Sequence, residues 1–156
     1  ARWQLQNGAT QLLCVSPSAP VPKHVIIHTL DASSRRATLA VAASLLRHVA
    51  AEAVYLVIHP RESVEAERAA RMRDLLDARS SALNDHGLDM RTEMRPGDVA
   101  DELQAELARY EYSMLVLGAS DAESIRWDWL ANVLEGTAAR PVLIVNAARL
   151  EVPVEA

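Results

Sequence analysis

The chain has 156 residues, of which 50% are hydrophobic and 24% are charged. This length suits one compact α/β domain, and so large an apolar fraction excludes a disordered chain. The net charge of -5 argues against nucleic acid as the main partner, because such binding depends on clustered positive charge. A single cysteine, Cys14, cannot form an internal disulfide, and no apolar run reaches the length of a membrane span. We therefore expect a cytoplasmic domain without direct insertion into a membrane.

From residue 23 to residue 146 the sequence alternates between strand and helix patterns. Short, apolar, β-branched runs are typical of strands that are covered on both faces. Such runs occupy residues 24–29, 53–58, 113–117 and 141–145. Residues 88–94 alternate apolar and polar side chains, which predicts a more exposed strand. Apolar residues at helical spacing predict helices over about 33–52, 62–86, 98–110 and 123–137.

The helix predicted over 62–86 carries apolar residues at helical spacing, and these predict the face that packs on the core. They are Ala69, Met72, Leu76 and Leu83. Gly87 suits the end of this helix, and Asp98 suits the N-cap of the next one.

This order of elements predicts a parallel sheet with helices on both faces. In such sheets, ligands bind at the carboxyl ends of the strands. The loops at that edge are residues 29–33, 58–63, 95–98 and 118–124. Of the five histidines, His59 is the one whose position, after a strand at this edge, suits a functional role.

Residues 1–22 stand outside the alternation, and two interpretations remain open. Prolines make residues 16–22 a stiff connector. The Asn7-Gly8 pair ahead of the connector predicts a β-hairpin. Alternatively, residues 9–16 resemble residues 139–146 in pattern and would be the closing strand of a preceding repeat of the same fold.

Five segments in order carry a resemblance to a known family. They are Thr29-Leu30-Asp31-Ala32-Ser33, Val57-Ile58-His59-Pro60, Arg95-Pro96-Gly97-Asp98, Met114-Leu115-Val116-Leu117-Gly118 and Arg140-Pro141-Val142-Leu143-Ile144-Val145. With these segments, residues 23–146 resemble a universal stress protein domain, and residues 147–156 would be a C-terminal tail. The resemblance implies a three-layer α/β/α fold of the adenine-nucleotide alpha hydrolase-like type, with five parallel strands in the order 3-2-1-4-5. It also implies a dimer joined through the last strands, with Val142 and Ile144 at the edge.

Members of this family that bind ATP carry Gly-x2-Gly-x9-Gly-Ser or Gly-Thr after the fourth strand, where glycines and backbone N–H groups hold the phosphates. Here Gly118 matches the first glycine. The second glycine, the third glycine and the hydroxyl position are occupied by Asp121, Ala131 and Asn132. On the nucleoside side, the resemblance implies Thr29, Asp31 and either Val57 or Ile58, whose backbone would meet adenine.

A carboxylate at position 121, about 5 Å from a phosphate, would cost roughly 3 kcal/mol at an effective dielectric of about 20. We therefore expect no tight ATP binding and no bound cofactor. Two of the matched residues have equally good structural roles, because Asp31 would cap the first helix and Gly118 would permit a turn.

The sequence contains no Rossmann fingerprint, phosphate loop, nucleophile elbow or close cluster of metal ligands, so we predict no catalytic residue and no metal site. The leading hypothesis is a non-catalytic domain that acts in stress response or regulation through dimerisation and protein contacts, as a homodimer or as a tandem-repeat pseudo-dimer. Two alternatives remain. One is a cytoplasmic regulatory domain fused to a membrane transporter or sensor, and the other is a nucleotide-binding switch with an altered phosphate loop.

Overall fold

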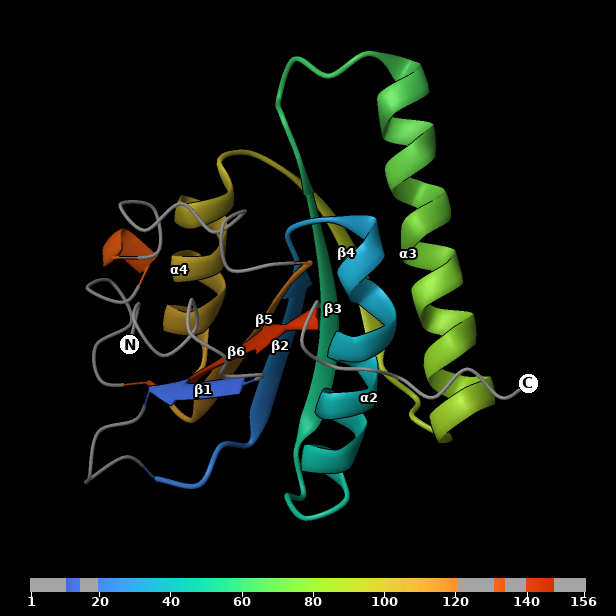
Figure 1. Cartoon of the computed structure of the whole chain (residues 1–156). Coiled ribbons are helices and arrows are strands. Elements are labelled where there is room, and N and C mark those ends of the chain that lie inside the picture. The colour runs from blue at the N-terminus through green and yellow to red at the C-terminus, as the bar shows by residue number, and fades with distance from the viewer. Residues whose placement is uncertain (1–10, 15–19, 121–130, 134–139, 148–156) are drawn as a thin grey trace.

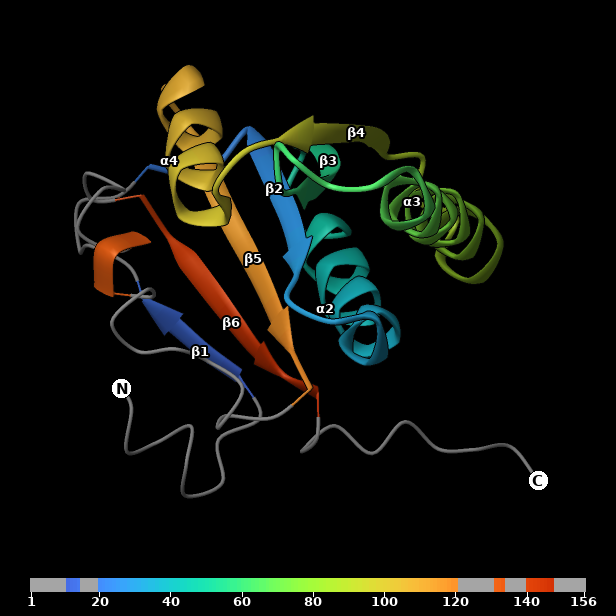
Figure 2. The same cartoon turned by 90° about the horizontal axis from the view of Figure 1, so that it is seen from above.

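The computed structural model describes residues 11–14, 20–120, 131–133 and 140–147. These residues form one sheet of six strands in the order β1-β6-β5-β2-β3-β4 (Figures 1 and 2). In chain order the strands are β1 (Gln11–Cys14), β2 (His24–Thr29), β3 (Glu52–His59), β4 (Arg91–Pro96), β5 (Ser113–Ala119) and β6 (Val142–Asn146). Strands β2 to β6 pair in parallel, whereas β1 is antiparallel to β6. The predicted α/β class and the order 3-2-1-4-5 of the five parallel strands are therefore confirmed.

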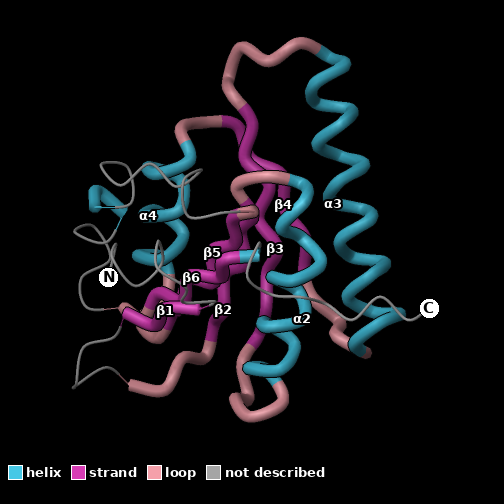
Figure 3. The backbone as a smooth tube through the Cα atoms, viewed as in Figure 1, coloured by secondary structure: helices cyan, strands magenta, loops and turns pink. Residues whose placement is uncertain are grey.

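Helices cover both faces of this sheet (Figure 3). The short 3-10 helix η1 (Ala32–Ser34) leads into α2 (Arg35–Leu46), which lies with α3 (Glu65–His86) on one face, and α4 (Val99–Arg109) lies on the other. Strand β2 serves both layers, since Val25 and Ile27 pack on the α2 side and Ile26 packs on the α4 side. Burial on both faces explains why the central strands have near-continuous apolar sequences.

Two helix ends are confirmed where the sequence predicted them. Gly87 follows α3 with φ of 62°, a left-handed conformation that glycine adopts without steric cost. The N–H of the next residue, Leu88, donates to the carbonyl of Ala82 at 3.0 Å and closes the last turn. Asp98 caps α4, because its side chain accepts from the N–H of Asp101 at 3.1 Å.

The predicted core face of α3 is wrong. Ala69, Met72, Leu76 and Leu83 are all exposed in the structure. The residues of α3 that pack on the core are instead Leu75, Ala78 and Ala82. The physical reason is close approach, because a face built largely of alanine lets a helix lie near the sheet and α2, and the larger side chains are then left on the outer side.

Other predicted boundaries differ by a few residues. Helix α2 ends at Leu46, ahead of the end predicted near residue 52, and β4 begins at Arg91 rather than at residue 88. Of the helix predicted over 123–137, the structure describes residues 131–133, which are helical. Within the described part of the chain, no helix is long and apolar enough to cross a membrane.

The described part of the N-terminal segment is strand β1, and its partner is the last strand of the sheet. Leu12 lies opposite Ile144, and Cys14 lies opposite Val142. The first half of the predicted hairpin falls within residues 1–10, outside the described residues. The edge that we predicted for a dimer is thus occupied by a strand of the same chain.

A cluster of charges joins β4 to α4. The Arg95 Nη2 atom lies 2.7 Å from Oε2 of Glu106 and 2.6 Å from Oε1 of Glu93. The Glu106 side chain is 1% exposed, whereas that of Arg91, whose Nη2 lies 4.0 Å from the other Glu106 oxygen, is 56% exposed. Arg95 is therefore the main cation that balances a buried carboxylate.

Candidate functional site at the carboxyl ends of the strands

Two neighbouring strands, β2 and β5, bring three of the predicted site residues to the same edge of the sheet. Thr29 is the last residue of β2 and lies opposite Gly118 near the end of β5. The N–H of Leu30 then donates to the carbonyl of Gly118 at 2.8 Å, which keeps the two chain segments together beyond the strands. Asp31 follows directly, so Thr29, Asp31 and Gly118 form the centre of the candidate site.

The Asp31 carboxylate ties the loop after β2 to the loop after β5. Its Oδ1 accepts from the N–H of Ser34 at 2.9 Å and from the hydroxyl of Ser33 at 2.8 Å, which makes it the N-cap of η1. Its Oδ2 accepts from the N–H of Ser120 at 3.0 Å. Burial opposes ionisation of this group, but the hydrogen bonds outweigh that effect and hold the pKa of Asp31 below its ordinary value.

Gly118 is required by the packing of helix α2. A Cβ atom at this position would lie 1.8 Å from Oγ1 and 2.9 Å from Cβ of Thr38. Thr38 cannot easily turn away, because its buried hydroxyl donates to the carbonyl of Ser34 at 2.7 Å. The first glycine of the nucleotide signature therefore has a structural role in this chain.

Thr29 belongs to a buried hydrogen-bond network rather than to an open surface. Its hydroxyl lies 2.8 Å from the hydroxyl of Tyr55, which donates in turn to Oδ2 of Asp74 at 3.4 Å. Asp74 also pairs with Arg35 at the start of α2. Burial raises the pKa of Tyr55 well above its ordinary value, so the phenol stays protonated. This network fixes α2 and α3 against the sheet.

The remaining residues of the predicted nucleotide site have varied positions. Val57 lies on β3, next to β2 in the sheet, and its side chain is buried in the core on the α2 side. Ala131 and Asn132 are exposed, and the carbonyl of Asn132 accepts from the side chain of Gln104 in α4. Asp121 lies outside the described residues.

His59, at the end of β3, is buried and engaged by its own loop. Its Nδ1 lies 2.9 Å from the carbonyl of Pro60 and 3.0 Å from the hydroxyl of Ser63. The carbonyl of His59 accepts from the N–H of Gly97 at 2.9 Å, which links the loops after β3 and β4. These contacts give the ring a role in shaping the loop.

Ser120 and Thr38 complete the site, although neither was predicted individually from the sequence. Ser120 contacts Asp31 through its backbone N–H, a group that carries no sequence signal. Thr38 had a signal that could have found it, because it lies four residues after Ser34 on a helix, where a threonine hydroxyl reaches the carbonyl one turn back.

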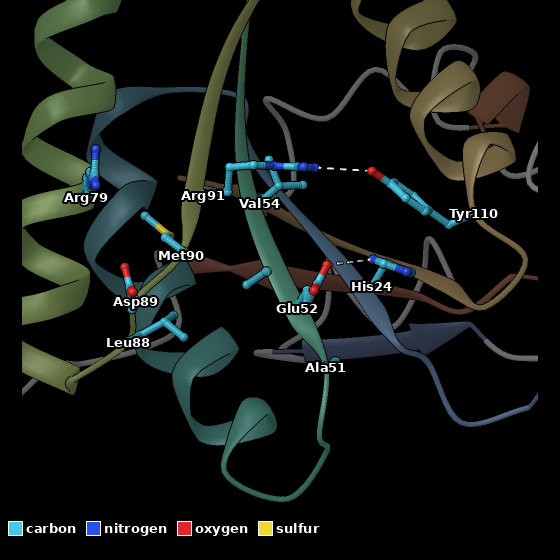
Figure 4. A pocket seen from close by; sticks show the side chains of 11 residues that line it. His24, Ala51, Glu52, Val54, Arg79, Leu88, Asp89, Met90, Arg91 and Tyr110 are labelled. Atoms are coloured by element: carbon cyan, nitrogen blue, oxygen red, sulfur yellow. Dashed lines mark hydrogen bonds and ion pairs between the residues drawn. The ribbon is translucent and has the colours of Figure 1, made fainter.

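A cavity of about 540 Å³ lies at the opposite edge of the sheet (Figure 4). It surrounds the start of β2 and β3, where His24 stacks on Tyr110 with ring centroids 3.9 Å apart and lies 3.5 Å from a Glu52 oxygen. Charges of both signs line it, from Arg79 and Arg91 to Glu52 and Asp89. The cavity is therefore separate from the site at Asp31.

Replacing Asp31 with alanine is expected to lower the free energy of unfolding by about 1–2 kcal/mol at pH 7, because the helix cap and the bond to Ser120 are both lost. The pKa of Asp31 is lower in the folded state than its ordinary value of 3.8, so its contribution is complete above that value and disappears as the pH falls through the folded pKa. Urea unfolding curves at several pH values measure this difference.

In that experiment Asp31→Asn is the matched control, because it keeps one acceptor oxygen but does not titrate. The difference between the Asn and Ala variants should stay constant with pH. A difference between the unmodified chain and the Ala variant that is as large at pH 3 as at pH 7 would contradict the stabilising role of the ionised carboxylate.

Comparisons with known proteins bear on the fold. No family model matches the sequence, and no curated protein matches it. Among solved structures, a universal stress protein in complex with cAMP has a TM-score of 0.63 at 19% identity, with 82% of this chain and 99% of that chain covered. The universal stress protein from Archaeoglobus fulgidus in complex with dAMP has a TM-score of 0.61 at 16% identity, with 81% and 98% covered.

A third structure, a protein from the universal stress protein family of Burkholderia pseudomallei, has a TM-score of 0.55 at 20% identity and covers 79% of this chain and 96% of its own. All three matches extend over the parallel sheet and its helices rather than over one motif, since each covers about four fifths of this chain. The chain therefore has the fold of the universal stress proteins.

Proposed function

We propose that this chain is a non-catalytic domain of the universal stress type, which acts in regulation through protein contacts and does not bind ATP tightly. The observation that carries the proposal is the hydrogen bond from the N–H of Ser120 to Oδ2 of Asp31, at 3.0 Å. Backbone N–H groups in such a loop are the donors that hold phosphates. Here one such donor is already used by a carboxylate of the protein, so a phosphate would meet a negative charge.

Two further features argue against tight binding of phosphates. The free space beside Gly118 is used by Thr38 of helix α2, so that glycine has a function without a ligand. The sequence adds a second carboxylate, Asp121, three residues further on. One like charge at about 5 Å costs roughly 3 kcal/mol, which corresponds to about two decades in affinity.

We assign no catalytic step to this edge of the sheet. Both oxygens of Asp31 accept hydrogen bonds from the loops that they join. The Nδ1 atom of His59 is held by Pro60 and Ser63. Asp31 and His59 therefore stabilise the loops in which they lie. This is what we expect of a domain that acts by binding partners through its surface rather than by catalysis.

Calorimetric titration of the purified chain with ATP and Mg²⁺ tests this proposal. We expect no saturable heat of binding below about 1 mM ligand. A dissociation constant of about 1 mM would correspond to a binding free energy of only about 4 kcal/mol. Far-UV circular dichroism shows that the protein is folded, and mass spectrometry excludes nucleotide carried over from purification. A dissociation constant in the micromolar range would overturn the proposal.

The variant Asp31→Asn shows whether the carboxylate is the cause. Removing its charge while keeping an acceptor oxygen should raise the affinity for ATP by roughly a hundredfold, because one repulsive charge worth about 3 kcal/mol is lost. A fall in affinity would instead mean that Asp31 holds the nucleoside, and would contradict the exclusion of phosphate by this residue.

The second candidate function is a nucleotide-binding switch with an altered phosphate loop. It is favoured by two solved structures of this fold, which are described as complexes with cAMP and dAMP. Those ligands carry one phosphate group, so they need less of the phosphate loop than ATP does. Titration with AMP separates the candidates, because micromolar binding of AMP without binding of ATP would favour the switch.

A further inference from the structure

Helix α3 carries an exposed apolar stripe that does not pack on the core. The side chains of Met72, Leu76 and Leu83 are between 40% and 54% exposed. Their spacings of four and seven residues place them on one side of the helix. Single exposed apolar side chains are common on proteins, whereas a contiguous group of them marks a contact surface. The residues that we predicted to pack on the core therefore form a surface of the domain.

The stripe lies on the side of α3 that faces away from α2. Asp74 pairs with Arg35 of α2, and Ser81 lines a small hollow beside the start of α2. Leu76 and Leu83 follow Asp74 and Ser81 by two positions each, and two positions turn through about 200° around a helix. Because α3 is the outer helix of its layer, beside β4, the stripe faces the open side of β4 (Figure 2).

Strand β4 forms one end of the sheet beside this helix. Among the described residues, β4 pairs with β3 along one edge, and no strand pairs with its other edge. Such an edge presents backbone donors and acceptors to another strand. Met94 packs on the α2 side of the sheet, whereas Arg95 contacts Glu106 on the α4 side. The even-numbered residues of β4 thus face the layer of α3, and the odd-numbered residues face the layer of α4.

The charges of β4 match those of a second copy of β4 in one antiparallel register. Along the α4 face, Arg91, Glu93 and Arg95 alternate in sign, and Asp89 precedes them. When Thr92 lies opposite Thr92 of the second copy, Arg91 lies opposite Glu93 and Asp89 lies opposite Arg95. A two-fold axis gives each of these opposite-charge pairs twice. Moving the axis by one residue would instead place Arg91 opposite Arg91, or Glu93 opposite Glu93.

The same axis brings the two apolar stripes together. It stands perpendicular to the sheet, so the two α3 helices lie on the same face of a joined sheet and run antiparallel. Helix α3 contacts both β3 and β4. Because neighbouring strands are about 4.8 Å apart, a helix over β3 and β4 lies about 5 Å from the axis. The two helices would then be about 10 Å apart, which is a normal distance between packed helices.

We propose that the β4 edge and the apolar stripe of α3 form one docking surface for a second copy of this chain, with a two-fold axis through Thr92. The charges of β4 set the register and exclude strands whose charges do not match. The stripe of α3 supplies the apolar burial. This surface lies at the opposite end of the sheet from β6 and β1. It contains no residue of the candidate site at Asp31, so the inference is independent of nucleotide binding.

Sedimentation velocity of the full chain at increasing protein concentration tests the apolar part of the surface. The unmodified chain should be a dimer at tens of micromolar. Leu76→Glu should weaken self-association by roughly a hundredfold or more, because two leucines lose their burial and two carboxylates approach each other. The matched control is Leu13→Glu, since Leu13 is as exposed as Leu76 but lies on β1 at the other end of the sheet.

The control variant should remain a dimer. An unmodified chain that is monomeric at these concentrations would overturn the proposal. A dimer that is lost in Leu13→Glu and kept in Leu76→Glu would also overturn it, because the contact would then lie at the other end of the sheet.

A charge exchange tests the register. Arg91→Glu and Glu93→Arg each place like charges opposite one another, so each variant alone should be monomeric. The double variant restores opposite charges with the signs exchanged and should form a dimer again. A mixture of the two single variants should form a heterodimer, because each supplies the charge that the other lacks. If both single variants are folded by circular dichroism but the mixture stays monomeric, or if they dimerise like the unmodified chain, the proposal is wrong.

Cysteine crosslinking locates the axis without depending on loss of the dimer. In a Cys14→Ser background, Thr92→Cys should form a disulfide between two copies, because residue 92 meets itself at the axis. Met94→Cys is the matched control on the same strand and the same face, since residue 94 would lie opposite residue 90 of the second copy. It should crosslink roughly tenfold less, because its two sulfur atoms are too far apart for a disulfide. Equal crosslinking at positions 92 and 94 would contradict the axis through Thr92.

Discussion

Replacing Gly118 with alanine is expected to lower the free energy of unfolding by about 3 kcal/mol, the upper part of the range for overpacking in a tight core. The added Cβ would lie 1.8 Å from Oγ1 of Thr38. Rotation of Thr38 does not remove the conflict, because the Cβ of Thr38 itself would be only 2.9 Å away. Either the hydroxyl loses its bond to the Ser34 carbonyl or α2 moves away from the sheet. Urea unfolding followed by circular dichroism measures the loss.

Gly87→Ala is the matched control for this substitution. Gly87 has φ of 62°, and a Cβ there would meet no atom within 4 Å, so the cost is limited to backbone strain of about 1 kcal/mol. Thr38→Ala should partly rescue the Gly118→Ala chain, because it removes the nearest atom. A Gly118→Ala chain as stable as the Gly87→Ala chain would show that the glycine is not needed for packing and would reopen a role in binding a ligand.

Replacing Arg95 with methionine is expected to lower the free energy of unfolding by about 3–5 kcal/mol, the cost of leaving a buried charge without its partner. The Glu106 carboxylate is 1% exposed, and its Oε2 atom lies 2.7 Å from Nη2 of Arg95. The next cations are Arg109, at 3.8 Å, and Arg91, at 4.0 Å, and both have side chains that are more than half exposed. Solvent screening and the conformational freedom of these two exposed side chains weaken their electrostatic attraction to the buried carboxylate. The readout is again the midpoint of urea unfolding.

Arg91→Met is the matched control, since Arg91 is on the same strand and approaches the same carboxylate. Because its side chain is exposed, the loss should be about 1 kcal/mol or less. In the double variant Arg95→Met with Glu106→Met, most of the stability should return, because neither charge is left alone. Equal losses for the two arginine variants would contradict the assignment of Arg95 as the main partner of Glu106.

Gly118 and the Arg95–Glu106 pair stabilise two different parts of the domain. Gly118 holds α2 close to the end of β5, where Asp31 bonds to Ser120. Arg95 and Glu106 hold β4 to α4.

The sequence by itself determined the elements and the arrangement of the parallel strands. Apolar, β-branched runs at 24–29, 53–58 and 113–117 can be stable only when both faces of a sheet are covered, and they became β2, β3 and β5. Gly87 and Asp98 marked helix ends because their effects are local, involving φ of one residue or a side chain that reaches three residues ahead. The resemblance of ordered segments then gave the strand order.

Only the tertiary structure decided what the matched residues do. The Asp31 carboxylate accepts a hydrogen bond from the N–H of Ser120, which lies 89 residues further along the chain. Position 118 requires a glycine because Thr38, on a helix about 80 residues earlier in the sequence, occupies the space that a Cβ atom would need. Helical spacing in α3 predicted the wrong face, and the face that packs on the core is the one rich in alanine because it allows close approach. The partner of β1 was likewise set by pairing across the whole chain. Helices and strands can be predicted from local sequence patterns because the interactions that form them involve residues a few positions apart. The role of an individual residue depends instead on contacts with distant parts of the chain, which form only when the chain folds.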